Sequence, residues 1–364
     1  MLEAFSLYLE LMLKRVRLIT LGLVVVGFVL LLNSKTQAAQ PQLSLTTSPI
    51  TLGLNIKPGI TNTQTLQLMN NTGQPVQITM QLKTFGAYGD TGQASIYDFS
   101  QGNPQPSWIK FSPSNFTAQP HVWSYVKATI AIPNNAVLGY YYAIVFQPAY
   151  ASSTTPGVAN IKGSNAILLL VDTGAGNEQR QLQVATFTVS RGIYQYLPAY
   201  FSVNIRNSGN IFVSPTGDIF ISRRSDGSHT INSLTVNSGG GNVLPNSNRV
   251  FTANWNNGFP VYQEKMQNGQ PIIGKNGQPE YKLVWNWANI SKFRIGKYYA
   301  KLALTYNNGT RQELLTSTVS FWVIPWVLLL IALAIIVLIL FAIYSMIRSI
   351  VRRFRGSYQP KRRF

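Results

Sequence analysis

Cysteine is absent from this chain of 364 residues, and histidine occurs only at His121 and His229. Without a thiol there is neither a cysteine nucleophile nor a disulfide, and two histidines are too few for an ordinary zinc site. We expect both to be surface or turn residues. The sequence also lacks a glycine-rich phosphate loop before a helix and the mixed α/β pattern that would house one. It therefore predicts no cofactor, no metal and no enzyme activity.

Acidic residues are scarce. Against 30 lysines and arginines there are 11 aspartates and glutamates, which gives a net charge of +19. This net charge resembles that of a nucleic-acid-binding protein, but the distribution of the basic residues along the chain does not. Seven basic residues lie in the last 17 residues and four flank an N-terminal apolar run, which leaves 19 basic and 9 acidic residues between positions 40 and 321. Much of the basicity is thus a membrane-topology signal, and we expect no nucleic-acid partner.

A long uncharged run lies near the C-terminus. Residues 322–347 contain no charge and are mostly Leu, Ile, Val and Ala. As a helix, about 25 such residues reach roughly 37 Å, more than the ~30 Å hydrocarbon core of a bilayer. Trp322 and Trp326 occupy the place of an interfacial aromatic belt, and Arg348, Arg352 and Arg353 open a basic tail over 348–364. The positive-inside rule predicts a single-pass protein of the cell membrane, with a cytoplasmic tail and extracellular N-terminal domains.

Residues 1–39 have the pattern of a secretory signal peptide. A basic segment starting at Met12 precedes an apolar run from Leu18 to Leu32, and small residues lead to Ala39. We expect cleavage after Ala38 or Ala39 and Met12 as the true start; the alternative is an uncleaved signal anchor. An exported chain without disulfides depends on its core alone, which suits a bacterial surface.

The exported region alternates apolar and polar residues with period two. Val76, Ile78 and Met80 alternate with polar neighbours, and Gly, Asn and Pro turns recur about every ten residues. This pattern predicts an all-β protein of two tandem immunoglobulin-like β-sandwich domains, followed by one C-terminal transmembrane α-helix. The expected ranges are 40–175 and 176–321.

Two sets of landmarks indicate a repeat of one plan. Asn71-Thr-Gly73 corresponds to Asn207-Ser-Gly209, and Gly139-Tyr-Tyr-Tyr-Ala143 corresponds to Gly296-Lys-Tyr-Tyr-Ala300. The second copy is longer, which predicts a hairpin insertion near 261–282. We expect a tyrosine of each Gly-x-Tyr-Tyr landmark to tie its hydroxyl to upstream backbone, as a tyrosine corner does. An aromatic ligand platform is the alternative.

Two features could carry chemistry or binding. Asp172-Thr-Gly174 follows an apolar strand, as in aspartic proteases, but no second Asp-Thr-Gly is present. We therefore expect an ordinary turn after the strand. An aspartic-protease-like hydrolase is a remote alternative. The second domain is the more basic one. Its residues Arg223, Arg224, Lys292 and Arg294 are either solvated strand faces or contacts to an anionic wall polymer or lipid surface.

Several segments carry a family resemblance. Pro106-Ser-Trp-Ile-Lys-Phe-Ser-Pro113, Phe116, Val126–Pro133, Asn135-Ala136 and Gly139–Ala143 resemble the first extracellular domain of the WxL-interacting surface proteins of Gram-positive bacteria. Asn207-Ser-Gly-Asn210, Pro215–Ile219 and Asn242-Val-Leu-Pro245 resemble the partner module. The resemblance implies a surface protein that binds peptidoglycan, WxL-type proteins or host molecules, and it carries over no ligand-contact residue.

These observations together predict a non-enzymatic, membrane-anchored binding or assembly protein of the cell surface. Its partners would be the membrane, peptidoglycan or another anionic wall polymer, and another surface protein paired through the hairpin insertion or an edge strand. The alternative is an adhesin-like binder of host molecules or glycans.

Overall fold

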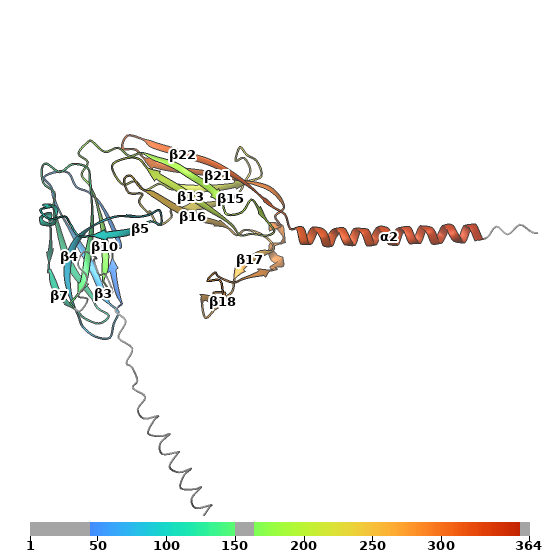
Figure 1. Ribbon diagram of the computed structural model, residues 1–364, viewed down its shortest axis with the longest axis horizontal. Coiled ribbons are helices and arrows are strands. Elements are labelled where there is room, and N and C mark those ends of the chain that lie inside the picture. The colour runs from blue at the N-terminus through green and yellow to red at the C-terminus, as the bar shows by residue number, and fades with distance from the viewer. Residues whose placement is uncertain (1–43, 150–163, 357–364) are drawn as a thin grey trace, which may run out of the picture.

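The computed structural model describes residues 44–149 and 164–356, the side chains as far as Arg352. The expected signal peptide (1–39), its Met12 start and the end of the basic tail fall outside these residues. The described chain is mostly β-strand, with one long apolar helix at its C-terminal end (Figure 1). The expectation of a predominantly β protein with one C-terminal apolar helix is therefore confirmed.

The strands before residue 173 form two facing sheets. The four-stranded sheet contains, in spatial order, β1 (Leu45–Ser48), β3 (Thr61–Asn70), β8 (Trp123–Ala131) and β6 (Ile109–Ser112). The six-stranded sheet contains β2 (Thr51–Asn55), β10 (Asn165–Asp172), β9 (Gly139–Pro148), β4 (Val76–Tyr88) and β5 (Gln93–Tyr97), with β7 (Asn115–Ala118) also paired to β4. Only β2 pairs in parallel, with β10. A short 3-10 helix, η1 (Gln105–Trp108), precedes β6.

The strands after residue 181 form a second pair of sheets. The three-stranded sheet contains β11 (Leu182–Val189), β13 (Ala199–Asn207) and β16 (Asn248–Trp255). The five-stranded sheet contains β12 (Ile193–Tyr194), β22 (Gln312–Val323), β21 (Gly296–Asn307), β14 (Thr216–Ser222) and β15 (Thr230–Val236). The long axes of the two sheet pairs lie at a steep angle to each other (Figure 1).

A hairpin projects from the second pair of sheets. β17 (Val261–Glu264) pairs with β20 (Tyr281–Val284), and the short strands β18 (Met266–Gln267) and β19 (Gln270–Pro271) form its tip. The 3-10 helix η2 (Trp287–Lys292) follows β20. In Figure 1 the hairpin hangs from the end of the sandwich at which the helix α2 (Trp326–Gly356) begins.

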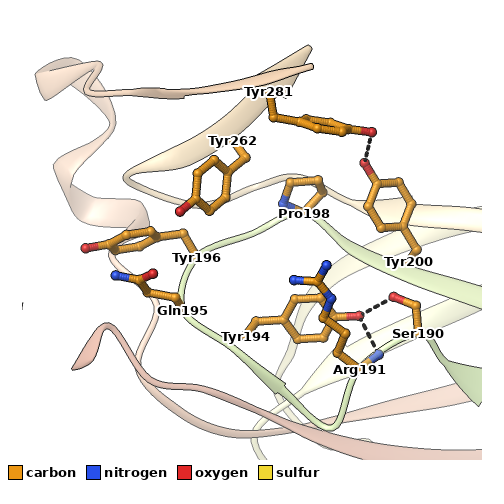
Figure 2. A pocket seen from close by; sticks show the side chains of 9 residues that line it. All are labelled: Ser190, Arg191, Tyr194, Gln195, Tyr196, Pro198, Tyr200, Tyr262 and Tyr281. Carbon is orange, nitrogen blue, oxygen red and sulfur yellow. Dashed lines mark hydrogen bonds between the residues drawn. The ribbon is translucent and has the colours of Figure 1, made fainter. Parts of the chain in front are cut away.

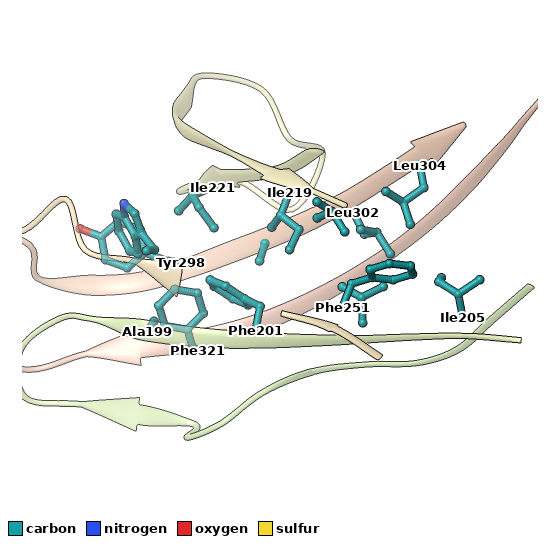
Figure 3. Packing of buried hydrophobic residues seen from close by; sticks show 14 of the residues in the cluster. Ala199, Phe201, Ile205, Ile219, Ile221, Phe251, Tyr298, Leu302, Leu304 and Phe321 are labelled. Carbon is teal, nitrogen blue, oxygen red and sulfur yellow. The ribbon is translucent and has the colours of Figure 1, made fainter. Parts of the chain in front are cut away.

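The period-two pattern explains how each sandwich closes on its own core. In β4 the side chains of Val76, Ile78 and Met80 are buried and those between them are exposed. In the second sandwich, β13 directs Phe201 and Ile205 toward Ile219, Ile221, Leu302 and Leu304 of the facing sheet (Figure 3). Burial of such apolar surface contributes about 25 cal/mol per Å² and is the main term that stabilises each sandwich.

The strand β9 does not alternate. Its residues from Tyr142 to Phe146 are all buried, because both of its faces are covered. One face belongs to the first core. The other, with Ala143 and Val145, joins Phe85 and Leu170 in a small cluster that residues of the second sandwich, Phe212 and Leu244, complete.

One asparagine plays the same part in both sandwiches. At the end of β3 the buried Asn70 side chain donates to the carbonyls of Gln74 (2.8 Å) and Ala118 (3.0 Å). At the end of β13 the buried Asn207 side chain donates to the carbonyls of Ile211 (2.8 Å) and Val243 (2.9 Å). The two turns are therefore equivalent, and the structural counterpart of Asn207 is Asn70, one residue before the landmark taken from the sequence.

The tyrosines of the Gly-x-Tyr-Tyr landmarks bond to upstream backbone, as predicted. The Tyr140 hydroxyl accepts a hydrogen bond from the Val137 N–H (3.2 Å), and the Tyr298 hydroxyl donates to the Ile295 carbonyl (3.5 Å). Each contact joins the start of a penultimate strand to the residue three positions before the tyrosine. These tyrosines are thus structural.

The apolar C-terminal run divides between a strand and a helix. Within the described residues one helical stretch, Trp326–Arg352, is long and apolar enough to cross a membrane; an 18-residue window of it has a mean hydropathy of 3.4, and none of that window is buried in the described part of the protein. The predicted start at Trp322 is wrong, because Trp322 belongs to β22 and pairs with Ile193 and Lys297. Phe321 and Val323 are buried in the core, so the period-two pattern of β22 continues into the uncharged run.

Candidate functional site

The second sandwich carries a pocket of about 460 Å³ between the chain segment 190–200 and the hairpin strands β17 and β20. This volume lies within the range of about 300–1,000 Å³ that is usual for small-ligand sites. Five tyrosines from separate elements surround it (Figure 2). The pocket is lined by Ser190, Arg191, Tyr194, Gln195, Tyr196, Pro198, Tyr200, Tyr262 and Tyr281.

Backbone contacts hold the hairpin against the 190–200 segment. The Tyr262 N–H donates to the Leu197 carbonyl (2.8 Å), and Leu197 and Val261 form an isolated parallel bridge. Tyr194 and Tyr196 are buried at the base, whereas Tyr200 and Tyr281 stand partly exposed at the mouth. The rings of Tyr196 and Tyr262 lie 5.9 Å apart. The two aromatic walls of the pocket are thus joined by backbone contacts.

Hydrogen bonds orient the tyrosine hydroxyls. The Tyr200 and Tyr281 hydroxyls lie 3.3 Å apart, and Tyr281 also donates to Glu264 (3.4 Å). The Tyr194 hydroxyl bonds the Ser190 hydroxyl (2.7 Å) and accepts from the Arg191 N–H (3.1 Å). Burial raises the pKa of Tyr196, and burial with the Tyr281 hydrogen bond raises that of Tyr200. Both groups are therefore neutral near pH 7 and can donate as well as accept hydrogen bonds.

The residues that line the pocket favour binding over catalysis. They include no carboxylate, histidine or cysteine, and Arg191 is their one charged group. Neutral tyrosines with raised pKa values are poor general bases at neutral pH. Flat apolar ring faces edged by hydroxyls, an amide and a guanidinium match a ligand with one C–H-rich face and a rim of hydroxyl groups.

Asp172 has a different role from the one the protease-like motif suggests. Its carboxylate forms an ion pair with Arg180 and accepts the Gly174 N–H (3.0 Å). The neighbouring Thr173 hydroxyl donates to the Leu138 carbonyl (2.7 Å). Asp172 ends β10 and Arg180 lies two residues before β11, so the pair joins the two sandwiches. Among the described residues there is no cluster of three or more His, Cys, Asp or Glu that could hold a metal ion.

The four basic residues singled out in the sequence are not one patch. Arg223 donates to the Tyr298 hydroxyl (3.2 Å) and lies over its ring, whereas Arg294 lies over Trp255 and donates to the Asn257 carbonyl (3.0 Å). Trp255 and Tyr298 are in contact, which brings these two arginines together. Burial lowers the pKa of Arg294. Arg224 lies in the exposed turn after β14, and Lys292 ends η2.

Sequence reasoning missed the pocket. Its tyrosines come from two segments more than 60 residues apart, 194–200 and 262–281. The available signal was the spacing Tyr194-x-Tyr196-x-x-x-Tyr200 together with a tyrosine near each end of the hairpin insertion. Tertiary contacts, such as the Tyr262 N–H to Leu197 carbonyl bond and the Tyr200–Tyr281 hydroxyl pair, show that these signals belong to one site.

No family model matches this chain, and no curated protein matches it. Among solved structures, the class 5 fimbriae chaperone CfaA is 14% identical, with 78% of this chain and 100% of that chain covered and a TM-score of 0.32. A chaperone–tip adhesin complex of CFA/I fimbriae is 16% identical (56% and 86% covered, TM-score 0.31). The CsuC–CsuE complex of Acinetobacter baumannii is 12% identical (57% and 89% covered, TM-score 0.30).

These comparisons correct the family expectation. The chain was expected to resemble the WxL-interacting surface proteins, but the three structures above are a fimbrial chaperone and two chaperone–adhesin complexes, and no family model matches. That assignment is therefore wrong. The TM-scores of these three structures are all below 0.5.

Proposed function

We propose that the protein is a non-enzymatic, single-pass membrane protein that presents two immunoglobulin-like β-sandwich domains, 40–175 and 176–321, as a binding module at the cell surface. The observation that carries this proposal is the junction between β22 and α2. Only Ile324 and Pro325 separate the last strand from a 27-residue apolar stretch, and no residue in its most apolar window is buried by the described part of the chain. A helix of this length and composition exposed to water would be strongly unfavourable, whereas a bilayer accommodates it.

The proposed orientation places the sandwiches outside and the basic end inside. Arg348 and Arg352 lie in the last turns of α2 together with Arg353, whose side chain falls outside the described part. Basic residues next to a span are retained on the cytoplasmic side. Trp326 begins the helix, and Trp322 lies at the same end of the sandwich, so both remain candidates for the outer interface.

The absence of cysteine makes this orientation directly testable. In intact cells, a membrane-impermeant maleimide should label a Leu314→Cys variant, since Leu314 is exposed on β22. A Ser357→Cys variant should be labelled only after lysis, because it follows the proposed span. The unmodified chain, which has no thiol, is the control. Labelling of Ser357→Cys but not of Leu314→Cys in intact cells would show the opposite orientation.

For the ligand we propose a sugar ring of a cell-wall or cell-surface glycan, bound in the tyrosine-lined pocket. A pyranose has an apolar C–H face and a rim of hydroxyls. The apolar C–H face of the sugar can stack on the rings of Tyr196 and Tyr262. The hydroxyls of the sugar can form hydrogen bonds with Gln195, Arg191 and the Tyr200–Tyr281 hydroxyl pair. This proposal keeps peptidoglycan among the expected partners and gives the glycan-binding alternative a defined site.

Replacing Tyr262 by alanine should weaken binding to purified peptidoglycan sacculi about tenfold, because one aromatic wall is lost and each tenfold corresponds to about 1.4 kcal/mol. Tyr281→Phe, which removes only a hydroxyl, should weaken binding less. Sedimentation of the full-length protein with sacculi measures both, with an N-acetylglucosamine oligomer as competitor. Tyr97→Ala on β5, another partly exposed tyrosine, is the matched control and should bind normally.

The same assay decides between this site and the anionic-polymer alternative. Binding through Arg223 and Arg224 would weaken steeply with salt and in the double Arg→Gln variant, because exposed charges are screened over about 10 Å at 0.1 M salt. If Tyr262→Ala binds fully while the double Arg→Gln variant loses binding, the glycan pocket is wrong and binding to an anionic polymer is supported. Capture of a surface protein through the hairpin would instead be lost when its tip is shortened.

A further inference from the structure

The segment around η2 exposes large apolar side chains that the pocket does not use. Trp287 is 65% exposed and Ile290 is 57% exposed, with Trp285 and Phe293 partly exposed beside them. Trp285 and Trp287 stack with centroids 5.9 Å apart, and Phe259 contacts both rings (5.7 and 5.2 Å). The exposed tryptophans are therefore held in place by packing. Clustered apolar exposure of this kind marks an interaction surface.

This cluster lies at the end of the sandwich from which α2 leaves. The Phe259 N–H donates to the Lys292 carbonyl (3.0 Å), and Phe259 and Phe293 form a parallel bridge. Three residues after Phe293, Gly296 pairs with Val323, the last residue of β22. On the other side of β22, exposed Ile193 pairs with Trp322, which is 44% exposed. In Figure 1 the hairpin hangs at the end of the sandwich where α2 begins.

The connection between the sandwich and α2 is short and hydrogen-bonded. Two extended residues reach at most about 7 Å. The Ile324 N–H donates to the Tyr194 carbonyl (2.7 Å), and the Leu329 N–H donates to the Pro325 carbonyl (3.1 Å). The linker is thus part of the folded structure on both sides. If α2 lies in a bilayer, this end of the sandwich has to meet the lipid surface.

The charge of this end matches an anionic surface. Residues 281–301 contain no Asp or Glu, but they contain Lys282, Lys292, Arg294, Lys297 and Lys301. Each lysine or arginine near an anionic leaflet contributes about 1 kcal/mol, and tryptophan prefers the headgroup region of a bilayer. Asp226 also lies at this end, where its carbonyl accepts a hydrogen bond from Lys301 (3.3 Å), but the five cations of residues 281–301 outnumber it. Apolar rings among cations are the pattern of a membrane-contacting surface.

We propose that the side chains of Ile193, Trp285, Trp287, Ile290, Phe293 and Trp322 form a membrane-facing rim that rests in the headgroup layer of an anionic bilayer. The inference depends on the proposed anchoring of α2 and adds to it. Anchoring alone leaves the ectodomain free to tilt, whereas the rim sets its orientation. Tyr196 of the pocket packs against Trp285 of the rim (6.4 Å), so the buried base of the pocket adjoins the rim.

The test uses nitroxide labels on single cysteines in the full-length protein, reconstituted in nanodiscs that contain phosphatidylglycerol. Ile290→Cys reports on the rim, Phe341→Cys on the middle of α2, and Leu314→Cys on an exposed β22 position away from the rim. Power saturation compares collisions with oxygen, which enriches in lipid, and with a water-soluble nickel chelate. We expect position 290 to collide several-fold less with the nickel chelate than position 314, and position 341 to be shielded from it.

The outcomes separate the rim from the anchor. Shielding at 341 with full nickel access at 290 would overturn the rim and leave the membrane anchor intact. Nickel access at 341 would overturn the anchor and the rim with it. Shielding at both positions supports the rim. Its attraction to anionic lipid would be supported by a several-fold rise in nickel access at 290, either in a Lys292→Glu background or in nanodiscs of phosphatidylcholine alone. Equal shielding in all three samples would contradict that charge dependence.

Discussion

Replacing Phe321 by alanine is expected to lower the free energy of unfolding of the second sandwich by about 3–5 kcal/mol, the usual cost of removing a buried aromatic side chain. Phe321 is 1% exposed. Its ring lies 5.6 Å from that of Phe201 and 5.9 Å from that of Trp255, with Tyr194 and Tyr298 also in contact. These neighbours belong to different strands of both sheets, so they cannot close the cavity by a small shift.

The same strand supplies the control. Leu314 also lies on β22 but is 60% exposed, so Leu314→Ala should change stability by less than about 0.5 kcal/mol. Hydrogen–deuterium exchange of the β21 and β22 amides in the full-length protein measures the effect locally and keeps the first sandwich as an internal reference. Because Tyr194 contacts Phe321, Phe321→Ala should also weaken ligand binding in the pocket. Unchanged β21 exchange in Phe321→Ala would contradict the proposed core.

Asp172→Asn is expected to cost about 2–3 kcal/mol at the junction between the sandwiches. The Asp172 and Arg180 side chains are only 12% and 21% exposed, and charged hydrogen bonds that are largely shielded contribute about 1.5–3 kcal/mol. The substitution keeps the shape and the acceptor for the Gly174 N–H but leaves the guanidinium without its carboxylate. The loss should appear as faster hydrogen exchange at residues 172–182.

A second ion pair gives the matched control. Lys265 and Glu280 are bonded at 2.9 Å in the hairpin but are 43% and 44% exposed. Glu280→Gln should therefore cost less than about 1 kcal/mol, because solvent screens exposed pairs. Arg180→Gln should reproduce the Asp172→Asn effect, and the double variant should cost less than the sum of the two. Hydrolysis of a generic peptide that disappears in Asp172→Asn would instead revive the protease-like alternative.

Further contacts cross the junction and limit what the loss of one ion pair can do. The Phe212 N–H donates to the Tyr141 hydroxyl (3.1 Å), and the Val250 N–H donates to the Asp90 carbonyl (2.8 Å). Burial raises the pKa of Tyr141, which keeps this hydroxyl neutral over the physiological range. Phe212 and Leu244 also cover the second face of the first sandwich. We therefore expect Asp172→Asn to loosen the junction without separating the sandwiches.

Local patterns in the sequence determined the kind of structure. The alternation around Val76, Ile78 and Met80 predicted half-buried strands because strand side chains point to opposite faces in turn, and the structure buries those three residues. The uncharged C-terminal run predicted a helix long enough to span a bilayer, and α2 has that length. The repeated Gly-x-Tyr-Tyr landmark predicted hydroxyl contacts to upstream backbone, which Tyr140 and Tyr298 make. All of these depend on residues close together in the chain.

The tertiary structure alone decided how those pieces meet. The strand β22 extends to Val323, because Phe321 and Val323 are buried in the core of the second sandwich. The apolar sequence alone does not distinguish these core residues from the start of the helix. The tertiary structure turned the Asp172 motif into a junction with Arg180 and brought tyrosines from two distant segments to one pocket. It also placed η2 at the end of the sandwich from which α2 leaves. The reason is that alternation and hydropathy are properties of neighbours along the chain, whereas the pocket, the Phe212–Tyr141 contact of the junction and the rim arise between segments that the sequence keeps far apart.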